Sequence, residues 1–310
     1  MNETLIVQTI ASVLAASVPL IYAGIGETLT EKVGVTNLSL DGTILLSAMV
    51  GFAAAYTTGS VLAGILAAMA IGALLALLVA YGSIALKQDQ VAVGFVLTLL
   101  AADLSSFLGK PFVRIPGPRV PHLPIPFLAD IPVVGPILFR HNILVYLAYL
   151  LVIGAWVWIS RTQPGLRLRA VGESPETADA MGISVTGYRY VHTVLGGALA
   201  GIGGAFYSLA IVPIWVDGMT KGVGWIAIAL VILGFWRPGL TLVGAYLFGA
   251  LQSLGVTLKA RNVSVSGDVL DALPFVMTIV VLVLVSSRWA HRRLGAPAAL
   301  GVPYEREERQ

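Results

Sequence analysis

The chain has 310 residues, of which 57% are hydrophobic and only 11% charged, and its formal net charge is +3. Soluble domains carry about 25% charged residues, so this composition excludes an ordinary water-soluble domain and favours a membrane protein. The basic residues cluster beside apolar runs, which fits orientation in a membrane better than binding to nucleic acid. The chain contains no cysteine, so it forms no disulfide and offers no thiolate to a metal.

Apolar runs long enough to cross a bilayer recur along the whole chain. We predict an all-α membrane protein, a polytopic bundle of about 8–10 transmembrane helices in a single transmembrane domain over 1–310. The N-terminus lacks the basic start of a signal peptide, so the first run is expected to be retained. The predicted membrane segments are 5–25, 38–56, 61–86, 90–109, 142–160, 189–212, 224–236, 239–260 and 270–288.

Two of these segments look too short or interrupted to be ordinary spans. The segment 38–56 follows a polar turn at Thr36 and Asn37. The segment 224–236 holds about 13 residues, which as a helix would reach about 20 Å, less than the ~30 Å hydrocarbon layer. The two segments also occupy matching places, each after a long span and a polar loop. This pattern predicts two half-helices in an inverted repeat, with a transport site between them.

The segments between spans give a prediction of sidedness. If 161–188 and the tail 289–310 are cytoplasmic, 12 of the 19 Lys and Arg residues lie on that side and 7 on the other, as the positive-inside rule favours. The loop 110–141 then lies outside. Its many prolines predict a stiff, extended segment across the outer face, either a plain connector or a contact for a partner.

The polar island Gly165–Ser184 interrupts an otherwise apolar sequence. Ser174 suits an N-cap, Pro175 the first helical position and Glu176 the positive end of a helix dipole. Gly182 can end the helix in the left-handed conformation. A helix over about 175–181 is too short to be stable in water on its own. We therefore interpret the island either as a docking surface or as a solvated loop with one helical turn.

Small residues are spaced along two predicted spans, which allows helix backbones to approach closely. Tight packing inside one subunit is favoured over a subunit interface. The residues concerned are Gly196, Gly197, Gly201, Gly203, Gly204, Ala245 and Gly249.

Three runs resemble one known family. Leu168–Val185 (LRAVGESPETADAMGISV) is similar to the cytoplasmic loop of ABC-importer permeases of the branched-chain amino acid, simple-sugar and nucleoside group. Gly26–Gly42 (GETLTEKVGVTNLSLDG) resembles the N-terminal signature of that group, and Gly218–Gly234 (GMTKGVGWIAIALVILG), followed by Trp236-Arg-Pro, is a third match. The matches occur in the expected order, and they look most like the smaller permease of a nucleoside or simple-sugar importer.

The resemblance implies a mechanism. Residues 175–181 would be a coupling helix seated on a cytoplasmic ATPase subunit. The chain has no GxxxxGK[ST] phosphate loop, so ATP and Mg would be bound by that partner, with no cofactor in this chain, which is then not an enzyme. The implied partners are a second permease subunit, two ATPase subunits, an extracytoplasmic substrate-binding protein and membrane lipid. The implied location is the inner membrane of a bacterium, with several spans and a cytoplasmic C-terminus. The coupling residues would be Arg167, Arg169, Glu173, Ser174, Pro175, Glu176, Asp179 and Gly182.

Candidate substrate-binding residues lie in the apolar segments. Asp103 falls well inside a span, where a carboxylate costs about 2.5–3.5 kcal/mol, so it is expected to face the bundle interior or a wet cavity. Asn37 and Asp41 open the segment 38–56, for substrate contact or for capping alone. Trp225, Phe95 and Trp215 offer faces for stacking on a nucleobase. For Trp215 a place in an interfacial belt is favoured over stacking.

The cargo predicted first is a nucleoside, then a simple sugar, then a branched-chain amino acid. The rival from another class is a secondary transporter driven by an ion gradient, with Asp103 as its proton or sodium site. A membrane-embedded enzyme has no motif in its favour, since the four histidines are scattered and no cluster has metal-ligand spacing.

Overall fold

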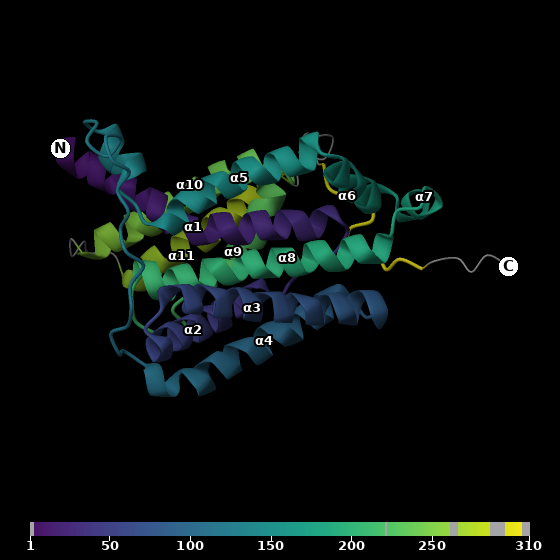
Figure 1. Ribbon diagram of the computed structural model, residues 1–310, viewed down its shortest axis with the longest axis horizontal. Helices are drawn as coiled ribbons and strands as arrows, with labels where there is room; N and C mark the ends of the chain where they lie inside the picture. Colours follow the sequence, from purple (N-terminus) through teal and green to yellow (C-terminus); the bar gives the residue numbers. More distant parts are fainter. Residues whose placement is uncertain (1–2, 221, 261–265, 286–294, 306–310) are drawn as a thin grey trace.

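The computed structural model describes residues 3–220, 222–260, 266–285 and 295–305. Within these ranges the fold is a bundle of helices, and strand pairing is limited to isolated bridges in the outer loop (Figure 1). The helices are α1 (Glu3–Lys32), α2 (Leu40–Thr58), α3 (Val61–Ala80), α4 (Gln90–Gly109), α5 (Ile143–Arg161), α6 (Gln163–Glu173), α7 (Pro175–Ala180), α8 (Val185–Phe206), α9 (Val223–Leu233), α10 (Pro238–Ala260) and α11 (Gly267–Val285).

The predicted all-α membrane fold is confirmed. Each of the nine predicted segments coincides with one helix, α1 to α5 and α8 to α11. Among the described residues, 7 helices are long and apolar enough to cross a membrane, and α9 is a shorter apolar helix. The predicted end of the first span at residue 25 is wrong, because α1 continues to Lys32. The polar residues that suggested a loop there are buried against other helices.

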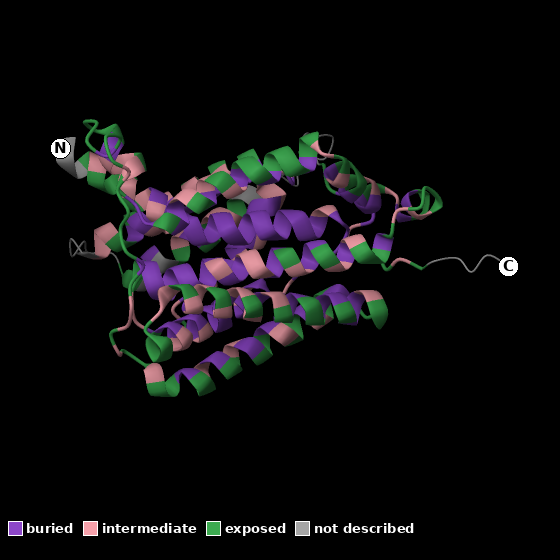
Figure 2. Cartoon of the chain, in the orientation of Figure 1, coloured by how far each residue is buried: buried purple, intermediate pink, exposed green. Residues whose placement is uncertain are grey.

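The centre of the bundle is formed by α1 and α8, with α3 and α10 packed against them (Figures 1 and 2). Glycines allow these helices to touch. A Cβ on Gly196 would lie 2.5 Å from the carbonyl oxygen of Gly26, and one on Gly197 would collide with the backbone of Gly72. The small-residue pattern therefore serves packing inside this subunit, as predicted, because no bulk fits between the backbones.

The helix α4 lies at the edge of the bundle. It packs on α2 through Gly94, Thr98, Ala101 and Ser105, which share one buried face. Its other face is exposed along its length, and Figure 2 shows it in green at the lower edge. One side of this helix is therefore available to lipid or to another protein.

Both α2 and α9 begin inside the bundle rather than at its ends. The Leu38 carbonyl, just before α2, accepts a hydrogen bond from the Thr98 hydroxyl at 2.8 Å. Thr98 lies eight residues into α4, so this contact is about 12 Å from the start of that helix. At the start of α9, the Gly224 N–H donates to Asp41 Oδ1 at 3.0 Å.

The lengths of the two helices differ. α9 has 11 residues and fits the predicted half-helix, whereas α2 has 19 and is not short. The inverted repeat stays a prediction.

The loop 110–141 crosses one end of the bundle as an extended segment, as its prolines predict (Figure 1). Backbone hydrogen bonds attach it to the segment that follows α8. Arg114 N–H donates to Trp215 O at 2.9 Å, and Gly117 N–H donates to Pro213 O at 3.0 Å. Trp215 is completely buried beneath this loop, so its predicted place in an interfacial belt is wrong.

The end of the chain returns to the opposite end of the bundle. Of the predicted tail 289–310, residues 289–294 and 306–310 lie outside the described residues. Within 295–305, Ala299 N–H donates to Gly172 O at 2.9 Å and Gly301 N–H donates to Gly34 O at 3.1 Å. This segment thus joins the end of α6 to the turn between α1 and α2.

Candidate functional site

Two surfaces carry the predicted functional residues: the α6–α7 hairpin at one end of the bundle, and the face shared by α2, α4 and α9. The predicted short helix exists as α7, Pro175–Ala180. It projects beyond the ends of the membrane helices, at the end opposite the outer loop (Figure 1). Gly182 adopts φ +78°, the left-handed conformation predicted for the residue that ends this helix.

One detail of the predicted cap is wrong. Ser174 occupies the N-cap position, but its side chain accepts no bond from a backbone N–H. Its Oγ instead donates to Thr177 Oγ1 at 2.7 Å, while its carbonyl accepts the Ala178 N–H at 3.0 Å. α7 is therefore not held by its cap.

What holds α7 is a small apolar cluster. Ala178 is buried against α6 and one end each of α1 and α8, together with Leu168 and Val171 of α6, Leu29 of α1 and Val185 of α8. Because these contacts reach α1 and α8, the central pair of the bundle, a force applied to α7 would be passed directly to the core.

Sequence reasoning missed the helix α6, which carries Arg167 and Arg169 and ends at Glu173. All three side chains are exposed. The signal was present: Thr162 Oγ1 accepts the Gly165 N–H at 3.1 Å as an N-cap, and a proline follows in the first turn. The hairpin therefore presents two helices to a partner rather than one.

The tip of the hairpin combines charge with one large apolar side chain. Glu176 is exposed and Asp179 is half-buried. Met181 is 78% exposed and was not among the predicted coupling residues. An exposed methionine beside charged residues is suited to insertion into a cleft of another protein, since its side chain is flexible and apolar.

On the second surface, the aromatic pair predicted from sequence is brought together. The ring centroids of Phe95 on α4 and Trp225 on α9 are 6.5 Å apart, with an interplanar angle of 44°. Phe95 is 49% exposed and Trp225 is half-buried. Trp225 lies one residue after Gly224, so the pair stands beside the contact between α9 and Asp41.

The two polar residues that precede and open α2 have different roles. Asn37 is completely buried, and its Oδ1 accepts bonds from the Ser39 N–H at 3.0 Å and the Ser39 hydroxyl at 2.6 Å. It is a turn and capping residue, so its side chain is not placed in an accessible site. Asp41 is half-buried and joins the starts of α2 and α9, where both helix dipoles are positive.

Asp103 does not face the interior of this bundle, so that part of the expectation is wrong, while a wet cavity stays a prediction. It is exposed on the outer face of α4, because that helix uses its Gly94, Thr98, Ala101 and Ser105 face for packing. Its neighbour Ser106 hydrogen-bonds a different acid, donating to Asp217 Oδ1 at 2.6 Å. In the single chain, Asp103 is thus a carboxylate on a surface that is otherwise apolar.

Two acidic residues that received no predicted role organise the inner end of α1. Glu27 Oε1 accepts the Asn37 N–H at 2.9 Å, and Glu31 Oε2 accepts the Trp236 indole N–H at 2.5 Å. Both glutamates are almost completely buried. They connect α1 to the start of α2 and to the turn between α9 and α10. Their i, i+4 spacing in an apolar helix was the available signal.

Comparison with known proteins agrees with this architecture. The family model for the permease component of the branched-chain amino acid transport system matches residues 9–282. A structure of a metal-chelate type ABC transporter in an inward-facing conformation shares the fold, with a TM-score of 0.52 at 17% identity, over 89% of this chain and 85% of that chain.

Three curated relatives align over nearly the full length. TsgC13 of Haloferax volcanii, whose name assigns it to a glucose ABC transporter, is 39% identical over 96% of this chain and 97% of its own. The nucleoside ABC transporter permease NupC of Lactococcus lactis is 34% identical over 95% and 96%. The guanosine ABC transporter permease NupQ of Bacillus subtilis is 32% identical over 97% of each chain. With a family match over most of its length and relatives of this kind, the chain belongs to the ABC-importer permeases of the branched-chain amino acid, sugar and nucleoside family.

Proposed function

We propose that this permease moves a nucleoside into the cytoplasm, as one subunit of an ABC importer. The observation that carries the proposal is the Phe95–Trp225 pair on the exposed side of α4, beside the start of a half-helix. A nucleobase offers a flat π-face, and stacking on an aromatic side chain is worth about 1–3 kcal/mol per base. The names of two relatives, for nucleoside and guanosine transport, support this cargo.

The charge at this place favours an uncharged cargo. The starts of two helices would attract an anion, but the Asp41 carboxylate already accepts the Gly224 N–H there. A cargo with a net negative charge would be repelled by this carboxylate. A neutral molecule rich in hydroxyl groups meets no such penalty.

A simple sugar is the second candidate. The relative named for glucose transport is 39% identical to this chain, and sugars are also neutral polyols. The two cargos differ in the importance of the aromatic pair, since a sugar has no π-system to stack.

Asp103 supports the presence of a second permease subunit. A carboxylate exposed to lipid in mid-span costs about 2.5–3.5 kcal/mol, and this cost falls if a partner covers α4 or water fills a path between the two subunits. The exposed face of α4 is the place for such a partner. In that assembly Asp103 would stand on the cargo path, able to accept hydrogen bonds from ribose hydroxyl groups.

The α6–α7 hairpin is proposed as the docking site for the ATPase subunit. Its exposed charges and Met181 would dock in a cleft of the ATPase subunit, which binds ATP and Mg, while the apolar cluster around Ala178 transmits the movement to α1 and α8. This assigns α6, α7 and the C-terminus to the cytoplasm, and the loop 110–141 to the side of the extracytoplasmic binding protein, in the plasma membrane of a bacterium.

Transport by the reconstituted importer tests the proposal. Proteoliposomes would contain this chain, the second permease and the ATPase, with the binding protein supplied outside. We expect uptake of labelled nucleoside that requires ATP, and weaker uptake after Asp103→Ala with assembly unchanged. Uptake of glucose but not of nucleoside would identify a simple sugar, the second candidate, as the cargo. Uptake by this chain alone under an ion gradient would reject an ABC mechanism in favour of a secondary transporter.

A further inference from the structure

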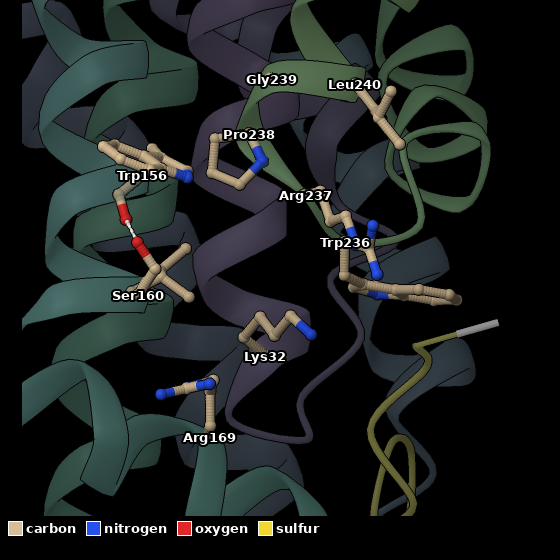
Figure 3. Close-up of a pocket in the computed structure, with 10 residues that line it drawn as sticks. Lys32, Trp156, Ser160, Arg169, Trp236, Arg237, Pro238, Gly239 and Leu240 are labelled. Carbon is tan, nitrogen blue, oxygen red and sulfur yellow. Dashed lines mark hydrogen bonds between the residues drawn. The ribbon is translucent and has the colours of Figure 1, made fainter. Parts of the chain in front are cut away.

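A cavity of about 510 Å³ lies where α1, α5, α6 and α10 meet, at the end of the bundle that carries the α6–α7 hairpin (Figure 3). Its volume is within the range of small-molecule sites. Three basic side chains line it, one from each of three separate segments: Lys32 ends α1, Arg169 lies on α6, and Arg237 precedes α10. No acidic residue is among the residues that line it within the described ranges.

The three cations lack carboxylate partners at ion-pair distance within the part of the chain that the structure describes. Lys32 Nζ donates to the backbone oxygen of Gly295 at 3.2 Å, and Glu173 acts on it electrostatically without lining the cavity. The charges of Arg169 and Arg237 act against that of Lys32. Such a group of like charges is destabilising unless an anion joins it.

The opposite wall of the cavity is apolar and belongs to membrane-spanning helices. Trp156 on α5 is 48% exposed and Leu240 on α10 is 42% exposed, whereas Ile159 is buried at the base. Trp156 and Leu240 continue along their helices into exposed apolar residues such as Ile153 and Val243. The cavity is therefore continuous with the lipid-facing surface, and tryptophan is typical of the level of the lipid headgroups.

We propose that this cavity binds the phosphate headgroup of an anionic phospholipid, whose acyl chains lie along the exposed apolar residues of α5 and α10. Arg169 and Arg237 provide planar donors that match phosphate oxygens, and Lys32 adds a compact positive charge. Basic pockets between transmembrane helices on the cytoplasmic side have this chemistry. Placement in the cytoplasmic leaflet depends on the proposed function, because that function assigns the hairpin to the cytoplasm.

The site couples a lipid to the moving parts of the importer. Arg169 belongs to the hairpin proposed to receive the ATPase, and Trp236, which also lines the cavity, is bonded to Glu31 of α1. An anion bound there would hold α6, the end of α1 and the turn before α10 together. Lipid binding would thus stabilise one position of the hairpin.

Native mass spectrometry of the purified full-length chain tests the site. We expect phosphatidylglycerol to be retained at least tenfold better than phosphatidylcholine. Each removed basic residue costs about fivefold, so Arg169→Gln with Arg237→Gln should weaken retention about 25-fold. The matched control is Arg167→Gln with Lys87→Gln, which removes two cations at the same end but outside the cavity and should leave retention unchanged.

Several outcomes would overturn the proposal. One is that the unmodified chain retains phosphatidylglycerol and phosphatidylcholine equally well. Another is that the control variant loses as much lipid retention as the cavity variant. Glycerol 1-phosphate that stabilises the protein as strongly as the whole lipid in a thermal-shift assay would identify a soluble anion site instead. If the double variant does not fold, the comparison of lipids on the unmodified chain still decides. Cysteine labelling that places the hairpin outside the cell would defeat the proposed function while leaving selective lipid binding intact.

Discussion

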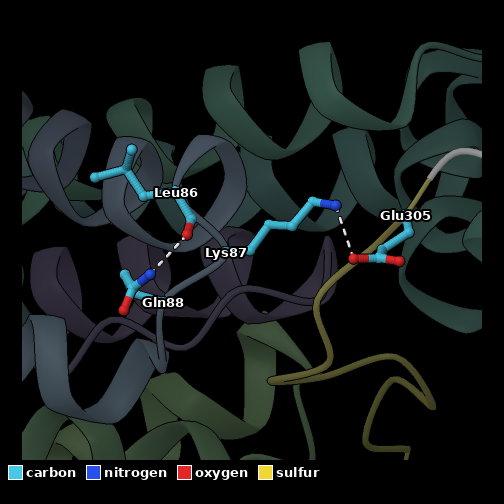
Figure 4. Close-up of polar contacts among 4 residues, drawn as sticks. All are labelled: Leu86, Lys87, Gln88 and Glu305. Carbon is cyan, nitrogen blue, oxygen red and sulfur yellow. Dashed lines mark hydrogen bonds and ion pairs between the residues drawn. The ribbon is translucent and has the colours of Figure 1, made fainter.

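Lys87 Nζ lies 2.7 Å from Glu305 Oε1, which joins the turn between α3 and α4 to a segment 218 residues further along the chain (Figure 4). The same segment is bonded to Gly34 and Gly172 through its backbone, and Arg189 donates to Val302 O at 3.0 Å. The end of the chain therefore connects four parts of the bundle on the side of the α6–α7 hairpin.

The two kinds of contact in this segment should differ in strength. The Lys87–Glu305 pair is exposed, so Glu305→Gln should leave the melting temperature nearly unchanged. Deletion of 295–310 removes the N–H donors of Ala299 and Gly301, which bond the carbonyl oxygens of Gly172 and Gly34. Both places should then open more often, so hydrogen exchange of the amides around Gly34 and Gly172 should rise several-fold. Exchange that is equally fast in the complete chain would show that the segment does not hold the hairpin.

The α6–α7 hairpin should be necessary for ATPase binding but not for folding. We expect Glu176→Arg, Met181→Asp or deletion of 174–182 to leave the protein in the membrane and to abolish co-purification with the ATPase. The two substitutions change only exposed side chains, and the deletion removes α7, which lies beyond the ends of the membrane helices. Asp130→Arg, an exposed charge reversal in the outer loop, is the control. Normal co-purification of the hairpin variants would show that the ATPase docks elsewhere.

The aromatic pair should matter more for a nucleobase than for a sugar. Loss of one stacking partner of about 1–3 kcal/mol corresponds to a decrease of about 5- to 150-fold in nucleoside uptake after Trp225→Ala. Trp225→Phe keeps a ring and should recover much of the activity. Uptake is measured against the amount of assembled complex. An equal response to alanine and phenylalanine would mean that Trp225 has a packing role only.

Helix contact at Gly197 should tolerate no side chain. A Cβ there collides with Gly72, so Gly197→Ala should destabilise the protein by about 1–3 kcal/mol or force α3 away from α8. Gly154 on α5 is the matched control, since a Cβ there would meet nothing within 4 Å. Thermal unfolding in detergent compares them. Similar melting temperatures for both variants would contradict the close approach.

The outer loop should loosen as the pH falls. His141 is buried, and its Nε2 donates to Ile137 O at 2.7 Å. Burial lowers the pKa of His141 below its ordinary value of 6.5, and the charge of His122 acts in the same direction, against a smaller opposite effect of the Ile137 hydrogen bond. The unfolded loop therefore binds a proton more readily than the folded one. The stabilisation is complete above pH 6.5 and is lost as the pH falls below that value.

Hydrogen exchange over 122–146, corrected for its intrinsic pH dependence, measures this effect. Opening should increase between pH 7.5 and 5.5 in the unmodified chain. His141→Gln keeps a donor for Ile137 and does not titrate, so its exchange should not respond. The same response in both proteins would assign the opening to another group.

Much of the fold followed from hydropathy alone. Runs of apolar residues located nine helices, of which 7 are long and apolar enough to cross a membrane, and α7 was recognisable from Pro175 and Gly182 at its ends. The orientation of Asp103 was not predictable. In water, polar residues mark the outer face of a helix. In α4 the packed face instead holds small and hydroxyl-bearing residues, Thr98 and Ser105 among them, and the exposed face is largely apolar, so the usual rule does not show which face is which.

The remaining errors have a common cause. Glu27 and Glu31 received no predicted role, because the fold alone brings them to their partners, Asn37 and Trp236. α6 was overlooked because its buried side is short. A tertiary contact can satisfy a charge that a local pattern treats as solvent-exposed.

The bond from Gly224 to Asp41 has a consequence for how the importer changes shape. It crosses from the first half of the chain to the second, and Gly224 also lies against the backbone at Leu40 and Asp41, so the beginnings of the two helices have no room to slide past each other. We therefore expect the two helix starts to keep this contact and to move as one unit in any change of conformation.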